Sequence, residues 1–149
     1  MKRLKDQRGL TLVELLAVIV ILGIISAIAI PSIGGIIQKS KEDALKADAI
    51  AVLNAAKMHI SSTNLTPDTS GGDTITMDDS ILTSYVDSDY FPDDKDSATS
   101  SYRVVYTIST QSYKLTTSAI DVSGKKITFN GAELDDINND KGKGTRTIQ

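Results

Sequence analysis

An apolar run near the N-terminus, residues 10–30, constrains this chain more than any other feature. As a helix it would be about 31 Å long, close to the thickness of a bilayer's hydrocarbon core. It is longer than the apolar part of an ordinary secretory signal, which is about 7–15 residues. We therefore expect a membrane-spanning helix. Three polar residues interrupt the run: Thr11, Glu14 and Ser26.

Charge sets the expected orientation of this segment. Residues 1–9 hold four basic residues and one acidic residue, a net charge of +3, whereas the whole chain has a net charge of −3. The positive-inside rule places such a basic end in the cytoplasm and exports the rest. A second interpretation stays open, because Ala27, Ile28 and Ala29 resemble a signal-peptidase site. The chain would then be a secreted binding domain released by a cut after Ala29.

Composition excludes several classes of site. The chain has no cysteine, so disulfides and thiolate zinc sites are excluded, and its single histidine excludes a multi-histidine metal site. The net negative charge gives no basis for coating nucleic acid. No phosphate-binding loop and no group of acid, base and nucleophile stands out. We therefore expect that the chain is not an enzyme and has no cofactor.

The helical pattern continues beyond the apolar run to about Ser61. Apolar residues recur every three to four positions, and charged residues fill the opposite face, which predicts one long helix whose second half is amphipathic. Glu42 and Lys46 are placed for an i,i+4 ion pair on that charged face. The stripe comprises Ile33, Ile36, Ile37, Ala44, Leu45, Ala49, Val52, Leu53, Ala56 and Ile60.

The remainder predicts a small sheet for this stripe to cover. Residues 61–75 have loop composition, and a short helix follows, with Thr76 as its N-cap and Asp79 at the third helical position. From residue 102 the apolar period changes to two, which predicts three antiparallel strands within 102–109, 113–119 and 126–129. Residues 130–149 are expected to wrap around the domain or fray. The fold class is therefore α+β.

Glu14 needs an explanation, because an ionised carboxylate at the centre of a bilayer costs on the order of 3 kcal/mol. Its place near the cytoplasmic end would lower that cost, so a tolerated interfacial residue is one interpretation. The other is a charge that awaits a cation inside protein. Residues 10–38 contain no Lys or Arg, so the cation must come from elsewhere. A cut after Gly9 would create one, the α-amino group of Leu10.

Residues 8–16, RGLTLVELL, resemble the processing motif of type IV pilins and of the pseudopilins of type II secretion. In that family a short basic leader ends in Gly, a hydrophobic residue follows, and Glu is the fifth residue of the mature chain. Gly23 and Pro31 also stand where the family usually has Gly and Pro. Leu10 stands where Phe is commonest.

This resemblance implies a defined processing and assembly path. A prepilin peptidase would cut between Gly9 and Leu10 and methylate the Leu10 amine, and Glu14 would then meet the Leu10 amine of a neighbouring subunit. The helix would kink or soften at Gly23, Pro31, Gly34 and Gly35. The implied regions are a cleaved leader (1–9), a transmembrane and filament-core helix (10–31), the amphipathic half of the same helix (32–61) and an exported globular domain (62–149).

The resemblance also implies partners and location. The chain would form a helical homopolymer, with the help of minor pilins, an assembly platform protein and a cytoplasmic ATPase. It would begin as a single-pass precursor in the inner or cytoplasmic membrane and end in a surface filament, or in a periplasmic or wall-spanning pseudopilus. Nucleic acid would be a partner only of a DNA-uptake pilus. The function implied is that of a structural subunit, with major pilin preferred to pseudopilin or competence pilin.

Two acidic clusters are candidates for cation binding. Asp136, Asn138 and Asp140 have the alternating oxygens of a calcium loop, but the expected Gly lies one place too late, at Gly142, and Thr147 replaces the final Glu. We favour a solvated acidic turn over a calcium site here. The second cluster is expected to be a solvated loop. It comprises Asp87, Asp89, Asp93, Asp94 and Asp96.

Overall fold

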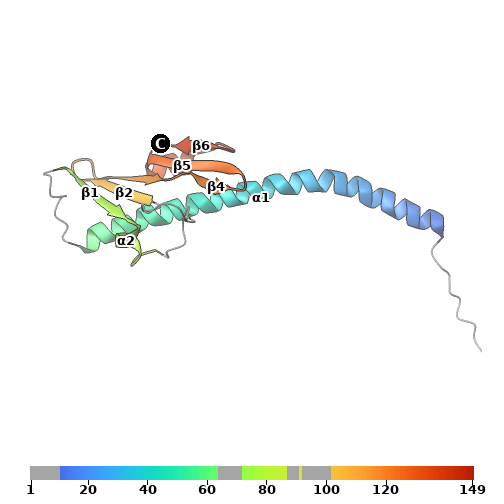
Figure 1. Ribbon diagram of the computed structural model, residues 1–149, viewed down its shortest axis with the longest axis horizontal. Coiled ribbons are helices and arrows are strands. Elements are labelled where there is room, and N and C mark those ends of the chain that lie inside the picture. The colour runs from blue at the N-terminus through green and yellow to red at the C-terminus, as the bar shows by residue number, and fades with distance from the viewer. Residues whose placement is uncertain (1–10, 64–71, 87–90, 92–101) are drawn as a thin grey trace, which may run out of the picture. The chain divides into compact units, whose positions relative to one another are not determined.

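The computed structural model describes residues 11–63, 72–86, 91 and 102–149 (Figure 1). One long helix, α1 (Leu12–Ser62), begins the described chain, and all the strands follow it. The chain divides into two compact units, Met1–Ile37 and Gln38–Gln149. The first part of α1 belongs to the first unit and the remainder of α1 to the second.

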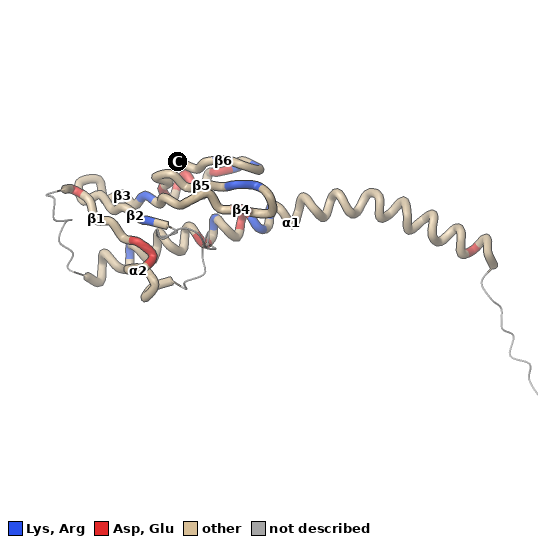
Figure 2. Tube along the Cα trace, in the orientation of Figure 1, with Lys and Arg blue, Asp and Glu red and all other residues tan. Residues whose placement is uncertain are grey.

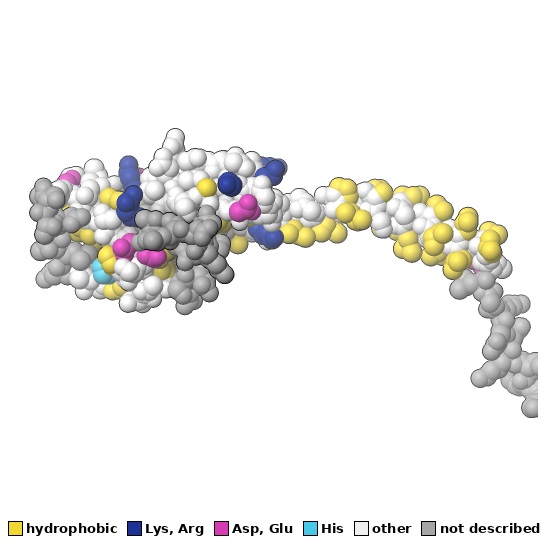
Figure 3. All heavy atoms as spheres, in the orientation of Figure 1, with side chains coloured by type: hydrophobic (Ala, Val, Ile, Leu, Met, Phe, Trp, Pro, Cys, Tyr) yellow, Lys and Arg dark blue, Asp and Glu magenta, His cyan; other side chains and the backbone are white. Residues whose placement is uncertain are grey.

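The described part of the first unit is an apolar helix without a core of its own. Its large hydrophobic side chains are at least half exposed, from 80% at Leu12 to 50% at Val18. One window of 18 residues has a mean hydropathy of 2.9, and none of it is buried. This stretch is therefore long enough and apolar enough to cross a membrane. Figure 3 shows the yellow hydrophobic side chains along it.

The second unit packs the rest of α1 against a sheet, so the predicted α+β class is confirmed. Within the described residues the sheet has six strands in the order β1-β2-β3-β5-β4, with β6 also paired to β5. The β5–β6 pairing is parallel and the others are antiparallel, so the sheet is mixed and larger than the three strands expected. The strands are β1 (Thr74–Asp78), β2 (Tyr102–Thr107), β3 (Ser112–Thr117), β4 (Ile120–Val122), β5 (Lys125–Ala132) and β6 (Arg146–Ile148).

The amphipathic stripe forms one side of the core from Leu45 onward. Leu45, Ala49, Val52, Leu53 and Ala56 are at most 5% exposed, as their spacing predicts. They pack with alternate residues of the strands. By contrast, the stripe residues before Gln38 are exposed in the described structure. The strand residues that are fully buried include Met77, Val104, Leu115, Ile127 and Phe129.

The predicted N-cap at Thr76 is wrong, because Thr76 lies inside β1. Ile75 and Met77 alternate with polar neighbours, and this short pattern forms an edge strand paired with β2. The short helix α2 (Asp79–Leu82) begins later, and its cap is Asp78, whose carboxylate accepts a hydrogen bond from the Ile81 amide at 3.2 Å. The cap chemistry is the expected one, two residues further along the chain.

Most of residues 130–149 form regular secondary structure that packs with the sheet. They complete β5, then form the short helix α3 (Leu134–Asn139) and the strand β6. Ile137 and Ile148 are buried at 0% and 4% exposure, so both contribute to the core. The expectation of fraying is therefore wrong, because β6 pairs in parallel with Ile127 to Phe129 of β5.

Candidate processing and assembly site

Glu14 closes a capping box at the start of α1. The backbone amide and the hydroxyl of Thr11 both donate to Oε2 of Glu14, each at 2.8 Å. The amide of Glu14 in turn donates to the Thr11 hydroxyl at 3.3 Å. Thr11 is thus the N-cap and Glu14 the third helical residue, so two otherwise unpaired amides of the first turn are satisfied.

This geometry gives Glu14 a role before any neighbour arrives. The carboxylate is held by the amide of Thr11, the second residue after the expected cleavage position. Gly9 and Leu10 lie outside the described residues, so the cleavage and methylation site stays a prediction. The sequence held a signal for the capping box, since Thr-x-x-Glu before an apolar run is its usual form. The interpretation of Glu14 as an unpaired charge overlooked it.

The other predicted residues of this helix lie along its exposed surface. Pro31 is inside α1, and the helix continues through Gly34 and Gly35. A Cβ built at Gly23, Gly34 or Gly35 would meet no atom of the described residues within 4 Å. The packing described here therefore does not require glycine at these positions, and the kink on assembly stays a prediction.

A partly buried ion-pair network joins β6 to α1 in the second unit. Arg146 Nη1 lies 2.8 Å from Glu42 Oε2, and Arg146 Nη2 lies 2.6 Å from Asp140 Oδ2. Lys46 Nζ lies 2.9 Å from the same Asp140 oxygen. The predicted pairing of Glu42 with Lys46 is not what these distances show: each residue has its partner in the segment 140–146. Sequence reasoning missed this network, because Glu42 was assigned to the solvated face.

The protonation behaviour of the network follows from burial opposed by cations. Burial alone raises the pKa of Asp140, but hydrogen bonds from Arg146, Lys46 and the Gly142 amide outweigh it and bring that pKa to about 2. Burial likewise opposes ionisation of Glu42, yet hydrogen bonds from Gln38 and Arg146 leave its pKa below the ordinary value. Both carboxylates are therefore charged at neutral pH and held by Arg146.

The three calcium candidates are not brought together around one point. Asp136 accepts a hydrogen bond from the Glu133 amide at 2.8 Å in a capping box for α3. Asn138 is an exposed residue of α3. Asp140 is bound by Lys46 and Arg146, as described above. Among the described residues, no group of three or more His, Cys, Asp or Glu is placed to hold a metal ion. The acidic cluster within residues 87–96 lies outside the described residues.

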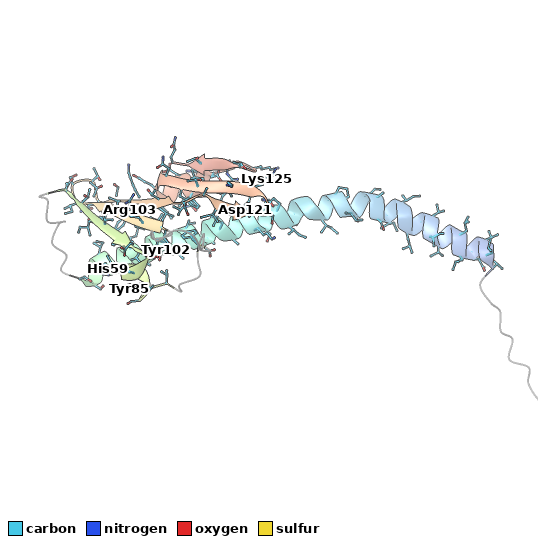
Figure 4. The ribbon with its side chains drawn as sticks, in the orientation of Figure 1. His59, Tyr85, Tyr102, Arg103, Asp121 and Lys125 are labelled. Carbon is cyan, nitrogen blue, oxygen red and sulfur yellow. The ribbon has the colours of Figure 1, made fainter. Side chains whose placement is uncertain are left out.

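His59 packs as a structural residue. Its ring meets Tyr85 edge to face, with centroids 5.5 Å apart and planes at 79° (Figure 4). Its Nδ1 is buried and has no hydrogen-bond partner among the described residues. Tyr85 is held in turn by the hydroxyl of Ser62 at 2.8 Å.

Comparisons with known proteins find relatives of this chain and a match to its N-terminal sequence motif. Residues 4–30 match the prokaryotic N-terminal methylation motif. Over 72 residues the chain is 33% identical to type II secretion system core protein G of Vibrio cholerae serotype O1, covering 48% of this chain and 49% of the relative. It is 36% identical over 68 residues to the protein of the same name from Aeromonas hydrophila, covering 46% and 48%. The protein of that name from Escherichia coli K12 is 34% identical over 59 residues, covering 40% and 41%.

The chain thus spans about half the length of the curated relatives it matches. No solved structure matches it significantly. The methylation motif matches residues 4–30, and the structure adds the long apolar helix and the α+β unit. The resemblance of this chain to the type IV pilin and type II secretion pseudopilin family is therefore confirmed.

Proposed function

We propose that this chain is a structural subunit of a type IV pilus-like filament. The observation that carries the proposal is the exposed apolar stretch of α1, which overlaps the methylation motif of residues 4–30. No residue of its 18-residue apolar window is buried among the described residues. Exposed apolar surface on this scale needs either lipid or other subunits around it. It would be lipid-facing in the precursor and protein-facing in the filament.

Processing would convert the first state into the second. A prepilin peptidase would cut after Gly9 and methylate the Leu10 amine on the cytoplasmic side. Thr11 holds the Glu14 carboxylate at the first turn of the helix, where the amine of a neighbouring Leu10 could reach it. Pairing of the two charges would offset the cost of burying each and would set the axial register between subunits.

N-terminal analysis of the mature chain tests this path directly. A mature chain that begins at methylated Leu10 supports the proposal. A mature chain that begins at Ile30 would instead support a secreted binding domain with an ordinary signal peptide, and the filament proposal would then be wrong.

Two filament classes remain to be separated. The leader and the apolar helix fit a major pilin, whereas the relatives named core protein G favour a type II secretion pseudopilin. Deletion of the gene separates them. Loss of surface filaments in electron micrographs supports a major pilin, and accumulation of undelivered secreted proteins with filaments intact supports a pseudopilin.

The proposed partners follow from this path: other copies of the chain, minor pilins, an assembly platform protein and a cytoplasmic ATPase. The proposed location is a membrane-anchored precursor with its N-terminus in the cytoplasm. Neither class requires catalysis by the chain itself, and the family is one of structural subunits.

A further inference from the structure

We propose that four lysines at one end of the second unit bind the phosphate headgroups of an anionic bilayer while the chain is still a membrane-anchored precursor. The inference rests on the proposed function, because it requires the apolar part of α1 to lie in a membrane. The lysine cluster comprises Lys39 and Lys41 of α1 and Lys125 and Lys126 of β5.

A tight hairpin holds the two halves of the cluster together. Ser123 and Gly124 join β4 to β5 with positive φ angles of 55° and 81°, the conformation of a two-residue type I′ turn. The Asp121 carboxylate accepts a hydrogen bond from the Gly124 amide at 2.7 Å and so stabilises the turn (Figure 4). The turn therefore fixes the backbone position of Lys125 and Lys126.

Two hydrogen bonds fasten this hairpin to the beginning of the second unit. Gln38 Nε2 donates to the carbonyl of Val122 at 3.0 Å, and Lys41 Nζ donates to the hydroxyl of Ser123 at 2.8 Å. The lysines of α1 and those of β5 thus lie at the same end of the unit. Figure 2 shows the blue segments on α1 and at the β4–β5 turn.

The charges of the cluster are exposed to solvent. All four lysines are exposed, and none forms an ion pair with another of the described residues. Lys46 and Arg146, in contrast, are only partly exposed and are paired with carboxylates. The carboxylate of Asp121 is engaged by the turn. The cluster is therefore free to bind an external anion.

Chain connectivity places the cluster at headgroup depth. The apolar stretch from Leu12 to Ile37 is about 39 Å long as a helix, which compares with about 40–45 Å for a bilayer with its headgroup regions. Lys39 follows that stretch by two residues. When the stretch spans the bilayer, the hairpin bonded to Gln38 and Lys41 must lie beside the phosphates of the far leaflet, which attract exposed lysines.

The test uses the full chain in lipid nanodiscs that carry a paramagnetic headgroup label. One set contains phosphatidylcholine alone, and the other contains about a third phosphatidylglycerol. The readout is paramagnetic relaxation of side-chain methyl protons of Val122, beside the cluster. Ile108, which precedes β3 and lies at the far end of the sheet from the turn, serves as the distant reference. We expect relaxation at Val122 to be at least twofold faster in the anionic discs, with Ile108 unchanged.

Charge-removal variants identify the groups responsible. Lys125→Gln combined with Lys126→Gln should remove most of the lipid-dependent difference at Val122. The matched control, Arg103→Gln with Lys114→Gln, removes two exposed charges from β2 and β3 and should leave the difference intact. Equal relaxation in both kinds of disc, or equal loss in both variants, would overturn the proposal. Failure of the chain to enter the discs would overturn the proposed function as well, and carbonate extraction detects that separately.

Discussion

Arg146 lies 2.8 Å from Glu42 although 104 residues separate them. Their side chains are 12% and 7% exposed, so the pair is shielded from water. Through this contact β6 is fastened to α1, the element against which the rest of the sheet packs. The chain has no cysteine to fasten its final residues, and this network does so instead.

Removal of Arg146 should strongly destabilise the second unit. Arg146→Gln leaves the buried Glu42 and the partly buried Asp140 without their main cation, a loss of about 3–5 kcal/mol in the free energy of unfolding. This loss is measured by thermal unfolding of the full chain in detergent, with the near-ultraviolet circular dichroism of the tyrosines as the signal. Lys114→Gln is the control, because its pair with Glu133 is half exposed and should contribute no more than about 1 kcal/mol. Similar losses of stability in both variants would show that the network stabilises the domain no more than an exposed ion pair does.

Acid should weaken the same network. The pKa of Asp140 falls from 3.8 to about 2 on folding, and that of Glu42 also falls below its ordinary 4.5. A lowered pKa contributes stability above the unfolded value and loses it as pH falls through the folded value. The contribution of Asp140, about 2 kcal/mol, should therefore be complete above pH 5 and disappear between about pH 4 and 2. Unfolding titrations at several pH values should show this slope, and Arg146→Gln should flatten it.

Gly142→Ala should disturb the network without removing any charge. A Cβ at this position would lie 2.6 Å from Arg146 Cδ and 2.9 Å from Asp140 Oδ1, closer than packing allows. We expect a loss of about 1–3 kcal/mol, measured by the same unfolding experiment. Gly72→Ala is the control, since the nearest atom to its Cβ is 3.7 Å away. An unchanged stability for Gly142→Ala would contradict the described position of Arg146.

Substitutions at Thr11 and Glu14 should separate helix capping from subunit pairing. Glu14→Gln keeps an acceptor for the Thr11 amide but removes the charge. Thr11→Val removes the hydroxyl and keeps the charge. Because a cation left unpaired in the filament is costly, we expect normal processing of Glu14→Gln but at least about tenfold less incorporation into filaments. Thr11→Val should lower incorporation less, and Thr11→Ser should restore it. Mass spectrometry measures processing, and quantification of sheared filaments measures incorporation.

If Glu14→Gln formed filaments at the wild-type level, the pairing of Glu14 with the Leu10 amine would be disproved. A defect of equal size in Thr11→Val and Glu14→Gln would point to capping as the main role of both residues.

Gly34 and Gly35 provide a test of local helix melting on assembly. Replacement of both by Ala should stabilise the helix by about 1 kcal/mol per residue, since neither Cβ would meet another described atom. If assembly requires this region to lose helix, the double variant should be processed normally and assemble poorly. Gly23→Ala, in the uninterrupted apolar helix, is the control for added side chains. Equal assembly of the wild type, the double variant and Gly23→Ala would exclude loss of helix at residues 34–35.

The features that could be predicted from the sequence are those set by neighbours along the chain. The long helix follows from hydropathy and from the spacing of Leu45, Ala49 and Val52, and the strands from alternation after residue 102. Three short strands were missed. β1 has five residues, and β4 and β6 have three each, so their patterns are too short to stand out. They form because β2 and β5 offer free edges.

Glu42 shows why a candidate site can escape sequence reasoning. By spacing it belongs to the buried stripe, three residues before Leu45. By residue type it belongs to the solvated face, and this consideration decided the prediction. Its burial is possible only because Arg146 supplies a charge from the other end of the domain. No local pattern contains that information.

If the second unit is exported as proposed, the separation of Glu42 from Arg146 also fixes an order of events. Residues 38–62 would leave the membrane first, with the Glu42 carboxylate on the face that the sheet must cover. That face would stay incomplete until residues 140–148 had crossed. A subunit whose translocation stalled before Arg146 would therefore expose an incomplete core to proteases outside the membrane.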